Sequence, residues 1–405
     1  MSKKLWTRDF TIVTFSTAVS MLGNAMSGFA IGLMVLDYTK SVFLYSLFIV
    51  GYNFPKVIMP ILAGPYIDQF SRKKMLYTLD FISAGLFLII GIIINFEVFH
   101  YLMFLSITIL IGSIDGIYRV TYDSLFPTLV DKENYHKAFS IYSVISPLST
   151  VMIPVAAILY ESIGLSLIFL IDALSFLIAA ICETQIKGGD FHSTKNTINL
   201  QSYLKDFKEG LSYIICEKGL FYITLYYAIS AFAFGTSLTI VLPYFKTTAG
   251  LGVVMYTFVM AFNIIGRIVS GLFQYRFTSL GKSRFKLMIT VCTIIAVVEA
   301  FYLFTPVIAM VILCFISGFL AIISNNIKSS STQKYVPDYI RGRFNGASQM
   351  INTLGSSIGS LLSGALAEII PLRFVIVIFM MINMFSVYFV IFLHKADVSL
   401  VYDIK

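Results

Sequence analysis

Hydrophobic residues in this chain are gathered into long runs that are separated by short polar segments. Each run is at least as long as the roughly 20 helical residues needed to cross the hydrocarbon core of a membrane. Backbone polar groups cannot be left unpaired in lipid, so each run is predicted to be a helix, and the alternating pattern typical of a membrane barrel is absent. The sequence therefore predicts an all-α membrane protein with twelve transmembrane helices. The runs span 10–36, 41–67, 75–96, 98–118, 138–160, 162–182, 219–245, 247–275, 285–305, 306–327, 344–367 and 374–393.

The composition supports this class of protein. Of 405 residues, 58% are hydrophobic and 12% are charged, and the mean hydropathy is +0.86. A soluble domain carries about 25% charged residues. The cysteines are far apart and lie mostly within hydrophobic runs, so neither a disulfide framework nor a metal site is expected. They are Cys182, Cys216, Cys292 and Cys314.

The net charge of +8 is explained by where lysine and arginine lie along the chain. Loops rich in these residues stay in the cytoplasm. With the amino terminus inside, the outer loops hold only Lys40, Lys246 and Arg373. The sequence thus predicts a multi-pass protein of the plasma (inner) membrane, with both termini cytoplasmic, whose partner is membrane lipid and not nucleic acid. The basic residues of the inner segments are Lys3, Lys4, Arg8, Arg72, Lys73, Lys74, Lys132, Lys137, Lys282, Arg284, Lys286, Arg341 and Arg343.

A polar stretch at about 183–210 interrupts the hydrophobic pattern in the middle of the chain. The apolar residues of 200–215 have the helical spacing that is typical of an interfacial helix. The sequence therefore predicts an amino-terminal six-helix bundle at 1–183, a cytoplasmic linker with an interfacial helix at 184–217, and a carboxy-terminal six-helix bundle at 218–405.

The two halves are weakly similar at an offset of about 206 residues. Val130-Asp131-Lys132 corresponds to Val336-Pro337-Asp338, and Gly64 to Gly271. Such similarity is expected of a duplicated helical unit. We therefore expect two six-helix pseudo-repeats with a site between them.

The turn after the second run carries the most specific motif, Gly64-Pro65-Tyr66-Ile67-Asp68-Gln69-Phe70-Ser71-Arg72-Lys73-Lys74. A glycine lets two helices approach closely, and a carboxylate just past it can face the positive amino-terminal end of another helix. A basic cluster can bind anionic headgroups. The stretch resembles the loop signature of the major facilitator superfamily. Gly64, Asp68, Arg72 and Lys73 match that signature, whereas Gln69 and Ser71 replace a basic residue and a glycine.

The resemblance implies the major facilitator fold and transport by alternating access. It assigns Asp68 to a cytoplasmic gate in which this carboxylate faces an eleventh helix that begins near Arg343. Arg72 is expected to pair with an acid at the end of the fourth helix, for which Asp123 is the candidate. The alternative is a basic loop that only sets topology, in which Asp68 has no role.

A second resemblance concerns the branch of the superfamily. The stretches Phe169–Leu177, Thr78–Asp80 and Lys208–Leu211 are similar to macrolide-efflux-type drug exporters and to related siderophore exporters. Pro154 stands where antiporters of the superfamily carry a proline flanked by glycines, although those glycines are absent here. The resemblance implies proton-coupled antiport of a small, bulky amphipathic compound such as a macrolide-like drug.

Other functions stay open at this point. An exporter of a siderophore, a self-made antibiotic or a peptide fits nearly as well, and an uncoupled facilitator is a further alternative. A membrane enzyme is not expected, because the four histidines are dispersed and no glycine-rich nucleotide-binding loop is present. We expect no cofactor and a monomeric protein. The histidines are His100, His136, His192 and His394.

Charged residues inside the hydrophobic runs are functional candidates, because an ionised group at the middle of a membrane helix costs about 2.5–3.5 kcal/mol. Asp115, Arg119 and Asp123 are spaced by four, so they share one helix face and the arginine can pair with either acid. Asp115 with Arg119 is the candidate for proton coupling, and a static ion pair is the alternative. The other charges in or beside the runs are Lys56, Asp80, Asp172, Arg267 and Glu299.

The substrate cavity is expected to be apolar with sparse polar groups. By analogy with the superfamily, the first, fourth, seventh and tenth helices line it, and their methionines and aromatic residues suit bulky ligands. Three roles are open for the Lys56 side chain. It can bind an anionic group, pair with an acid on another helix, or reach toward the membrane surface. The candidate cavity residues are Asn24, Met26, Phe29, Lys56, Tyr227, Phe234 and Asn325.

Overall fold

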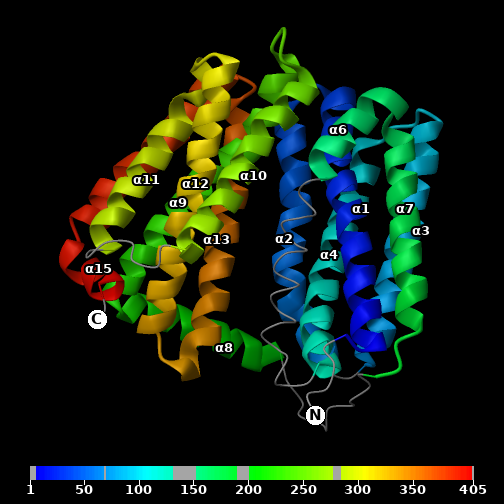
Figure 1. Cartoon of the computed structure of the whole chain (residues 1–405), viewed down its shortest axis with the longest axis horizontal. Coiled ribbons are helices and arrows are strands. Elements are labelled where there is room, and N and C mark those ends of the chain that lie inside the picture. The colour runs from blue at the N-terminus through cyan, green and yellow to red at the C-terminus, as the bar shows by residue number, and fades with distance from the viewer. Residues whose placement is uncertain (1–5, 68–69, 131–151, 189–199, 277–283, 404–405) are drawn as a thin grey trace. The chain divides into compact units, whose positions relative to one another are not determined.

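A computed structural model describes residues 6–67, 70–130, 152–188, 200–276 and 284–403. Within these ranges the chain forms fourteen α-helices and no strand (Figure 1), which confirms the all-α class. Ten of the helices are long and apolar enough to cross a membrane. The chain divides into two compact units.

The amino-terminal unit comprises Met1–Lys40 and Gly51–Leu200. Within it α3 packs along α7, and α1 packs against both α7 and α6. Two of the helices begin at side-chain caps, because Thr7 Oγ1 accepts a hydrogen bond from the Phe10 amide and Ser71 Oγ accepts one from the Lys74 amide. Its helices are α1 Arg8–Thr39, α2 Val42–Ile67, α3 Arg72–Asn95, α4 Tyr101–Leu125, α6 Met152–Ile163 and α7 Leu165–Thr184, with a 3₁₀ turn at Phe126–Leu129.

The carboxy-terminal unit comprises Ser41–Val50 and Gln201–Lys405, so α2 contributes its first residues to this unit and the rest to the other. Within it α9 packs along α13, and α10 packs along α12. The helices are α8 Leu200–Cys216, α9 Lys218–Thr247, α10 Gly252–Arg276, α11 Arg284–Phe301, α12 Val307–Tyr335, α13 Asp338–Leu366, α14 Leu372–Ser386 and α15 Lys395–Tyr402. A 3₁₀ turn follows α11 at Tyr302–Phe304, and a π-helix follows α14 at Val387–Phe392.

Two of the twelve predicted spans are not among the ten apolar helices. Most of 138–160 lies outside the described residues, and the described part is the short apolar helix α6. The eleventh span lies within α13, whose 29 residues are long enough, but its glycines, serines and asparagines lower its hydropathy. The count of twelve therefore stays a prediction, as do the predicted bundle limits. The helix expected at 200–215 is present as α8, and its position at a membrane interface stays a prediction.

The eleventh helix also begins earlier than its hydrophobic run indicated. α13 starts at Asp338, so the polar turn that contains Arg343 is already helical. α13 packs closely against α9, because a Cβ at Gly355 or Gly359 would overlap the backbone carbonyls of Ala228 or Phe232.

Candidate functional site

A close contact between α2 and α4 is the foundation of the candidate site. A Cβ on Gly112 would overlap the backbone carbonyl of Tyr52, and a Cβ on Gly116 would lie 2.8 Å from the carbonyl oxygen of Lys56. The two glycines, four residues apart on α4, therefore leave room for the backbone of Tyr52 and Lys56, four residues apart on α2. This is the small-residue packing that lets membrane helices approach closely.

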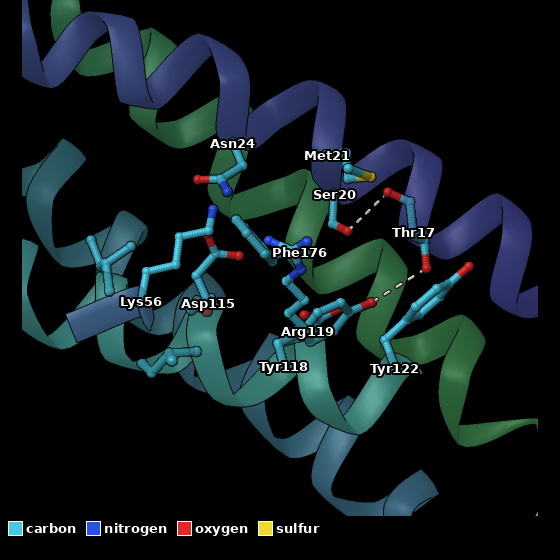
Figure 2. A pocket seen from close by; sticks show the side chains of 14 residues that line it. Thr17, Ser20, Met21, Asn24, Lys56, Asp115, Tyr118, Arg119, Tyr122 and Phe176 are labelled. Atoms are coloured by element: carbon cyan, nitrogen blue, oxygen red, sulfur yellow. Dashed lines mark hydrogen bonds and ion pairs between the residues drawn. The ribbon is translucent and has the colours of Figure 1, made fainter. Parts of the chain in front are cut away.

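The contact places Lys56 of α2 against Asp115 of α4, and the two side chains form an ion pair. Tyr52 Oη donates a hydrogen bond of 2.7 Å to Asp115 Oδ2. The side chains of Lys56 and Asp115 are 30% and 23% exposed, so the pair is partly withdrawn from solvent yet still accessible. Figure 2 shows Asn24 of α1 pointing toward this pair.

The pair lies in the wall of a cavity of about 260 Å³ within the amino-terminal unit. Arg119 of α4 (Figure 2) and Asp80 of α3 also line it. Two cations and two carboxylic acids therefore share one space. Thr17 of α1 and Tyr118 of α4 are neighbours in the wall of this cavity, and their hydroxyl oxygens lie 3.4 Å apart. Charged side chains from α2, α3 and α4 therefore meet in one cavity.

Three carboxyl groups of this unit, including that of Asp80, are buried. Glu183 of α7 accepts hydrogen bonds from Ser16 at 2.9 Å and Tyr118 at 3.1 Å. Asp172 accepts one from Ser175 at 2.9 Å. Asp80 is 1% exposed, and its Oδ2 has no hydrogen-bond partner among the described residues. The sequence did not single out Glu183, because this residue directly follows the hydrophobic run 162–182. An acid at that position is typical of a helix end that is exposed to water.

The structure arranges the predicted α4 charges differently from a simple triad. Asp115 pairs with Lys56, which is one of the three alternatives for that lysine. Arg119 lines the cavity one turn away, and Asp123 is exposed. The signal that could have located the pair is the glycine on either side of Asp115, at positions 112 and 116.

The predicted gate is described in part. Asp68 lies outside the described residues, and Gly64 lies in the last turn of α2. Arg72 Nη1 donates a hydrogen bond of 3.1 Å to the carbonyl oxygen of Ser124, the residue after Asp123. Lys73 is partly exposed in the first turn of α3. Arg72 thus reaches the expected end of α4.

Five of the seven candidate substrate residues line one of two cavities. Asn24 and Lys56 line the first, whereas Met26 is buried and Phe29 is partly buried on α1 away from its lining. A second cavity of about 240 Å³ lies within the carboxy-terminal unit. Its lining includes Tyr227, Phe234 and Asn325.

The chain matches a known family over most of its length. A family profile described as Major Facilitator Superfamily matches residues 13–360. The chain is 24% identical over 283 residues to "Uncharacterized MFS-type transporter YkuC" of Bacillus subtilis (strain 168). That alignment covers 65% of this chain and 64% of the relative, so it spans less than two thirds of the relative's length.

Solved transporters share the fold. A bacterial homologue of the human lysosomal transporter Spinster, in an inward-facing and occupied conformation, superposes with a TM-score of 0.73 at 13% identity and covers 98% of both chains. The nucleoside transporter NupG gives 0.70 at 15% identity, with 96% of this chain and 98% of that chain covered. A mutant of the peptide transporter POT gives 0.71 at 12% identity, with 97% of this chain and 95% of that chain covered.

Proposed function

The chain belongs to the Major Facilitator Superfamily, and from this membership we propose that it is a proton-coupled exporter of a bulky amphipathic compound such as a macrolide-like drug. As a family member it is an integral, multi-pass membrane transporter and not an enzyme. The direction of transport and the substrate class are supported by the stretches Phe169–Leu177, Thr78–Asp80 and Lys208–Leu211, which are similar to macrolide-efflux-type exporters.

The observation that carries the coupling proposal is the ion pair between Lys56 and Asp115 in the wall of a cavity. A proton that binds Asp115 neutralises the carboxylate and removes its attraction for Lys56. The ammonium group is then free to move or to meet a polar group of the substrate. Loss of the proton restores the pair, so each proton exchange at Asp115 changes the charge pattern that the substrate meets.

Alternating access makes this exchange productive, because a coupling group must be reached from each side of the membrane in turn. Tyr52 donates a hydrogen bond to Asp115, and Arg119 adds a second cation to the same space. In this mechanism the protein works as a monomer in the inner membrane, with both termini and the linker in the cytoplasm.

The gate belongs to the same proposal. Gly64, Asp68, Arg72, Lys73 and Asp123 would close the cytoplasmic side, with Asp68 facing the amino terminus of α13. A carboxylate at such a position contributes about 0.3–2 kcal/mol, which is enough to shift a balanced two-state equilibrium. Asp68→Asn should therefore impair transport and leave membrane insertion unchanged. Full activity of this variant would remove Asp68 from the mechanism.

Proteoliposomes test the coupling. The protein is reconstituted with radiolabelled erythromycin as the probe, and accumulation is measured with and without an imposed pH gradient. Asp115→Asn should keep downhill exchange and lose accumulation driven by the gradient, because the amide cannot titrate. Asp397→Asn on α15, outside both cavities, is the matched control and should behave as the unchanged protein.

Three other outcomes would each change one part of this proposal. Accumulation by Asp115→Asn that still collapses with an uncoupler would place the coupling carboxylate elsewhere, with Asp172 and Glu299 tested next. Transport by the unchanged protein that ignores the gradient would identify an uncoupled facilitator. Transport of a siderophore or a peptide in place of the macrolide would keep the mechanism and replace the substrate.

A further inference from the structure

The second cavity differs in chemistry from the first. It lies among α9, α11, α12, α13 and α14 of the carboxy-terminal unit, and none of its described lining residues carries a charge. The polar groups in its wall are hydroxyls and side-chain amides. They belong to Tyr226, Tyr227, Ser230, Ser324, Asn325, Asn352 and Asn383.

Two of these amides have unused hydrogen-bonding capacity. The Oδ1 atoms of Asn352 and Asn383 are buried and have no hydrogen-bond partner among the described residues. Asn383 as a whole is 1% exposed. A buried acceptor without a donor costs about 1–3 kcal/mol. A ligand in the cavity that donates a hydrogen bond to such an acceptor would remove this free-energy cost.

The two cavities occupy corresponding places in the repeated sequence. Residues 206 apart line both, and the pairs are Ser20 and Tyr226, Met21 and Tyr227, Asn24 and Ser230, Asp115 and Ala321, Tyr118 and Ser324, and Arg119 and Asn325. Where the first cavity has a carboxylate and a guanidinium group, the second has a methyl group and an amide. The second cavity therefore carries uncharged groups at the two positions that hold charges in the first.

A cation lies next to the wall of the second cavity. The Lys328 ammonium group lies 3.8 Å from the ring centroid of Tyr227, which lines the wall. This positive charge and the absence of a carboxylate from the described lining disfavour a cationic ligand. The aromatic rings of Tyr226, Tyr227 and Phe234 favour a flat apolar group.

From these observations we propose that the second cavity binds an uncharged compound, or an uncharged part of one, that carries an aromatic or flat apolar group and at least two hydroxyl or N–H donors. The donors meet Asn352 and Asn383, and the flat group lies against the tyrosines. This proposal rests on the proposed export function, because it describes the chemistry of the transported compound. It adds a recognition site that is separate from the Lys56–Asp115 pair.

Equilibrium binding to the purified full-length protein in detergent tests the site without any need for transport. The probes are chloramphenicol and salicin, which are uncharged aromatic compounds with several donors. Chloramphenicol 1,3-diacetate, in which both hydroxyls are capped and only the amide N–H remains as a donor, and ethidium, a permanent cation, are the comparison probes. We expect saturable binding of the first two and weaker binding of the capped compound and of the cation.

Asn383→Leu and Asn352→Leu should each weaken binding of chloramphenicol about tenfold, which is the effect of one lost hydrogen bond. Neither variant should lower Tm, because a similar-sized apolar side chain replaces an unpaired amide. Thr293→Val on α11 is the matched control. Its hydroxyl donates to the Ile289 carbonyl of the same helix at 2.8 Å, and it lies outside the lining. This variant should bind as the unchanged protein does.

Three results would overturn the proposal: no saturable binding of either uncharged probe, tighter binding of ethidium than of both, or unchanged affinity in the two asparagine variants. The outcome is separable from that of the export proposal. If the protein binds chloramphenicol through Asn383 but accumulates no probe, the binding site is supported and the export function is contradicted. If the protein accumulates erythromycin but Asn383→Leu binds every probe as the unchanged protein does, the export function is supported and the binding site is contradicted.

Discussion

Gly116 of α4 lies directly against the backbone of Lys56 on α2, where a Cβ would be 2.8 Å from the Lys56 carbonyl oxygen. The neighbouring residue, Asp115, pairs with the Lys56 side chain. A backbone contact and a charge contact therefore occur at the same point of the two helices. Because Gly116 has no side chain, α2 approaches α4 closely enough for Asp115, the residue that we propose for coupling, to pair with Lys56.

Gly116→Ala should separate α2 from α4, because the added methyl group has no room and the neighbouring atoms are backbone and a proline ring. Overpacking of this kind costs about 1–3 kcal/mol. We expect a lower Tm and a loss of gradient-driven transport. Gly85→Ala on α3 is the matched control, because no atom lies within 4 Å of a Cβ there. Equal Tm values for the two variants would contradict the packing.

Lys56 and Asp115 should depend on each other for stability. Lys56→Met leaves a partly buried carboxylate without its cation, so we expect a lower Tm. Asp115→Asn in the same chain should restore part of it, since the charge is then removed. The coupling free energy in a double-mutant cycle should be about 1–2 kcal/mol, between the values of exposed and buried pairs. Additive changes would show that the pair contributes nothing.

Hydrophobic runs predicted most helices because a membrane helix must be apolar around most of its circumference. The runs 75–96 and 162–182 correspond to α3 and α7 within a few residues. The same reasoning failed at the start of α13, where a polar helix extends beyond its apolar run. Hydropathy reports the contact with lipid and not the length of the helix. It also gave no indication of α15, a short helix with few consecutive apolar residues.

The candidate site was less predictable than the helices. The positions of Asp115 and Arg119 on one helix face follow from a spacing of four, but the partner of Asp115 is decided by helix packing. Tyr52 lies 63 residues before Asp115 in the sequence, and no local pattern joins them. The orphan amide of Asn383 was also invisible, because a lone asparagine in an apolar run gives no sign of which way it faces.

Arg343 joins the linker helix to α13. Its Nε lies 2.8 Å from Asp206 Oδ1, and its Nη1 lies 2.6 Å from Glu209 Oε2, both on α8. A Cβ on Gly210 would overlap the Arg343 carbonyl, so the backbones also approach closely there. The planar guanidinium group can contact two carboxylates at once, which an ammonium group cannot do with the same geometry.

Arg343→Lys should therefore loosen α8. The three side chains are 38–45% exposed, so the loss should be about 1 kcal/mol, equivalent to about fivefold faster amide hydrogen exchange across Leu200–Cys216. Arg341→Lys is the matched control, because Arg341 pairs with Asp338 of its own helix at 2.5 Å. Faster exchange in the control, or unchanged exchange in Arg343→Lys, would contradict a clamp made by Arg343.

Glu368, between α13 and α14, caps the start of α2. Its Oε1 accepts hydrogen bonds from Ser41 Oγ at 2.7 Å and from the Phe43 amide at 3.0 Å. These bonds favour the ionised carboxylate, and they lower the pKa of Glu368 below its usual value of 4.5. A negative charge beside the first turn of a helix also suits the helix dipole.

Glu368→Gln should lower Tm at pH 7 by a small amount, because Glu368 is exposed and such a charge contributes about 0.3–1 kcal/mol. The direction with pH follows from the lowered pKa. The stabilising contribution is complete above the unfolded-state pKa near 4.5 and is lost as the pH falls through the lower folded-state value. The difference in Tm between the two proteins should therefore be constant from about pH 8 to pH 6 and shrink toward about pH 3. Asp397→Asn serves as a carboxylate control from another helix. A Tm difference that grows on acidification would show that Glu368 is not held in its charged form by Ser41 and Phe43.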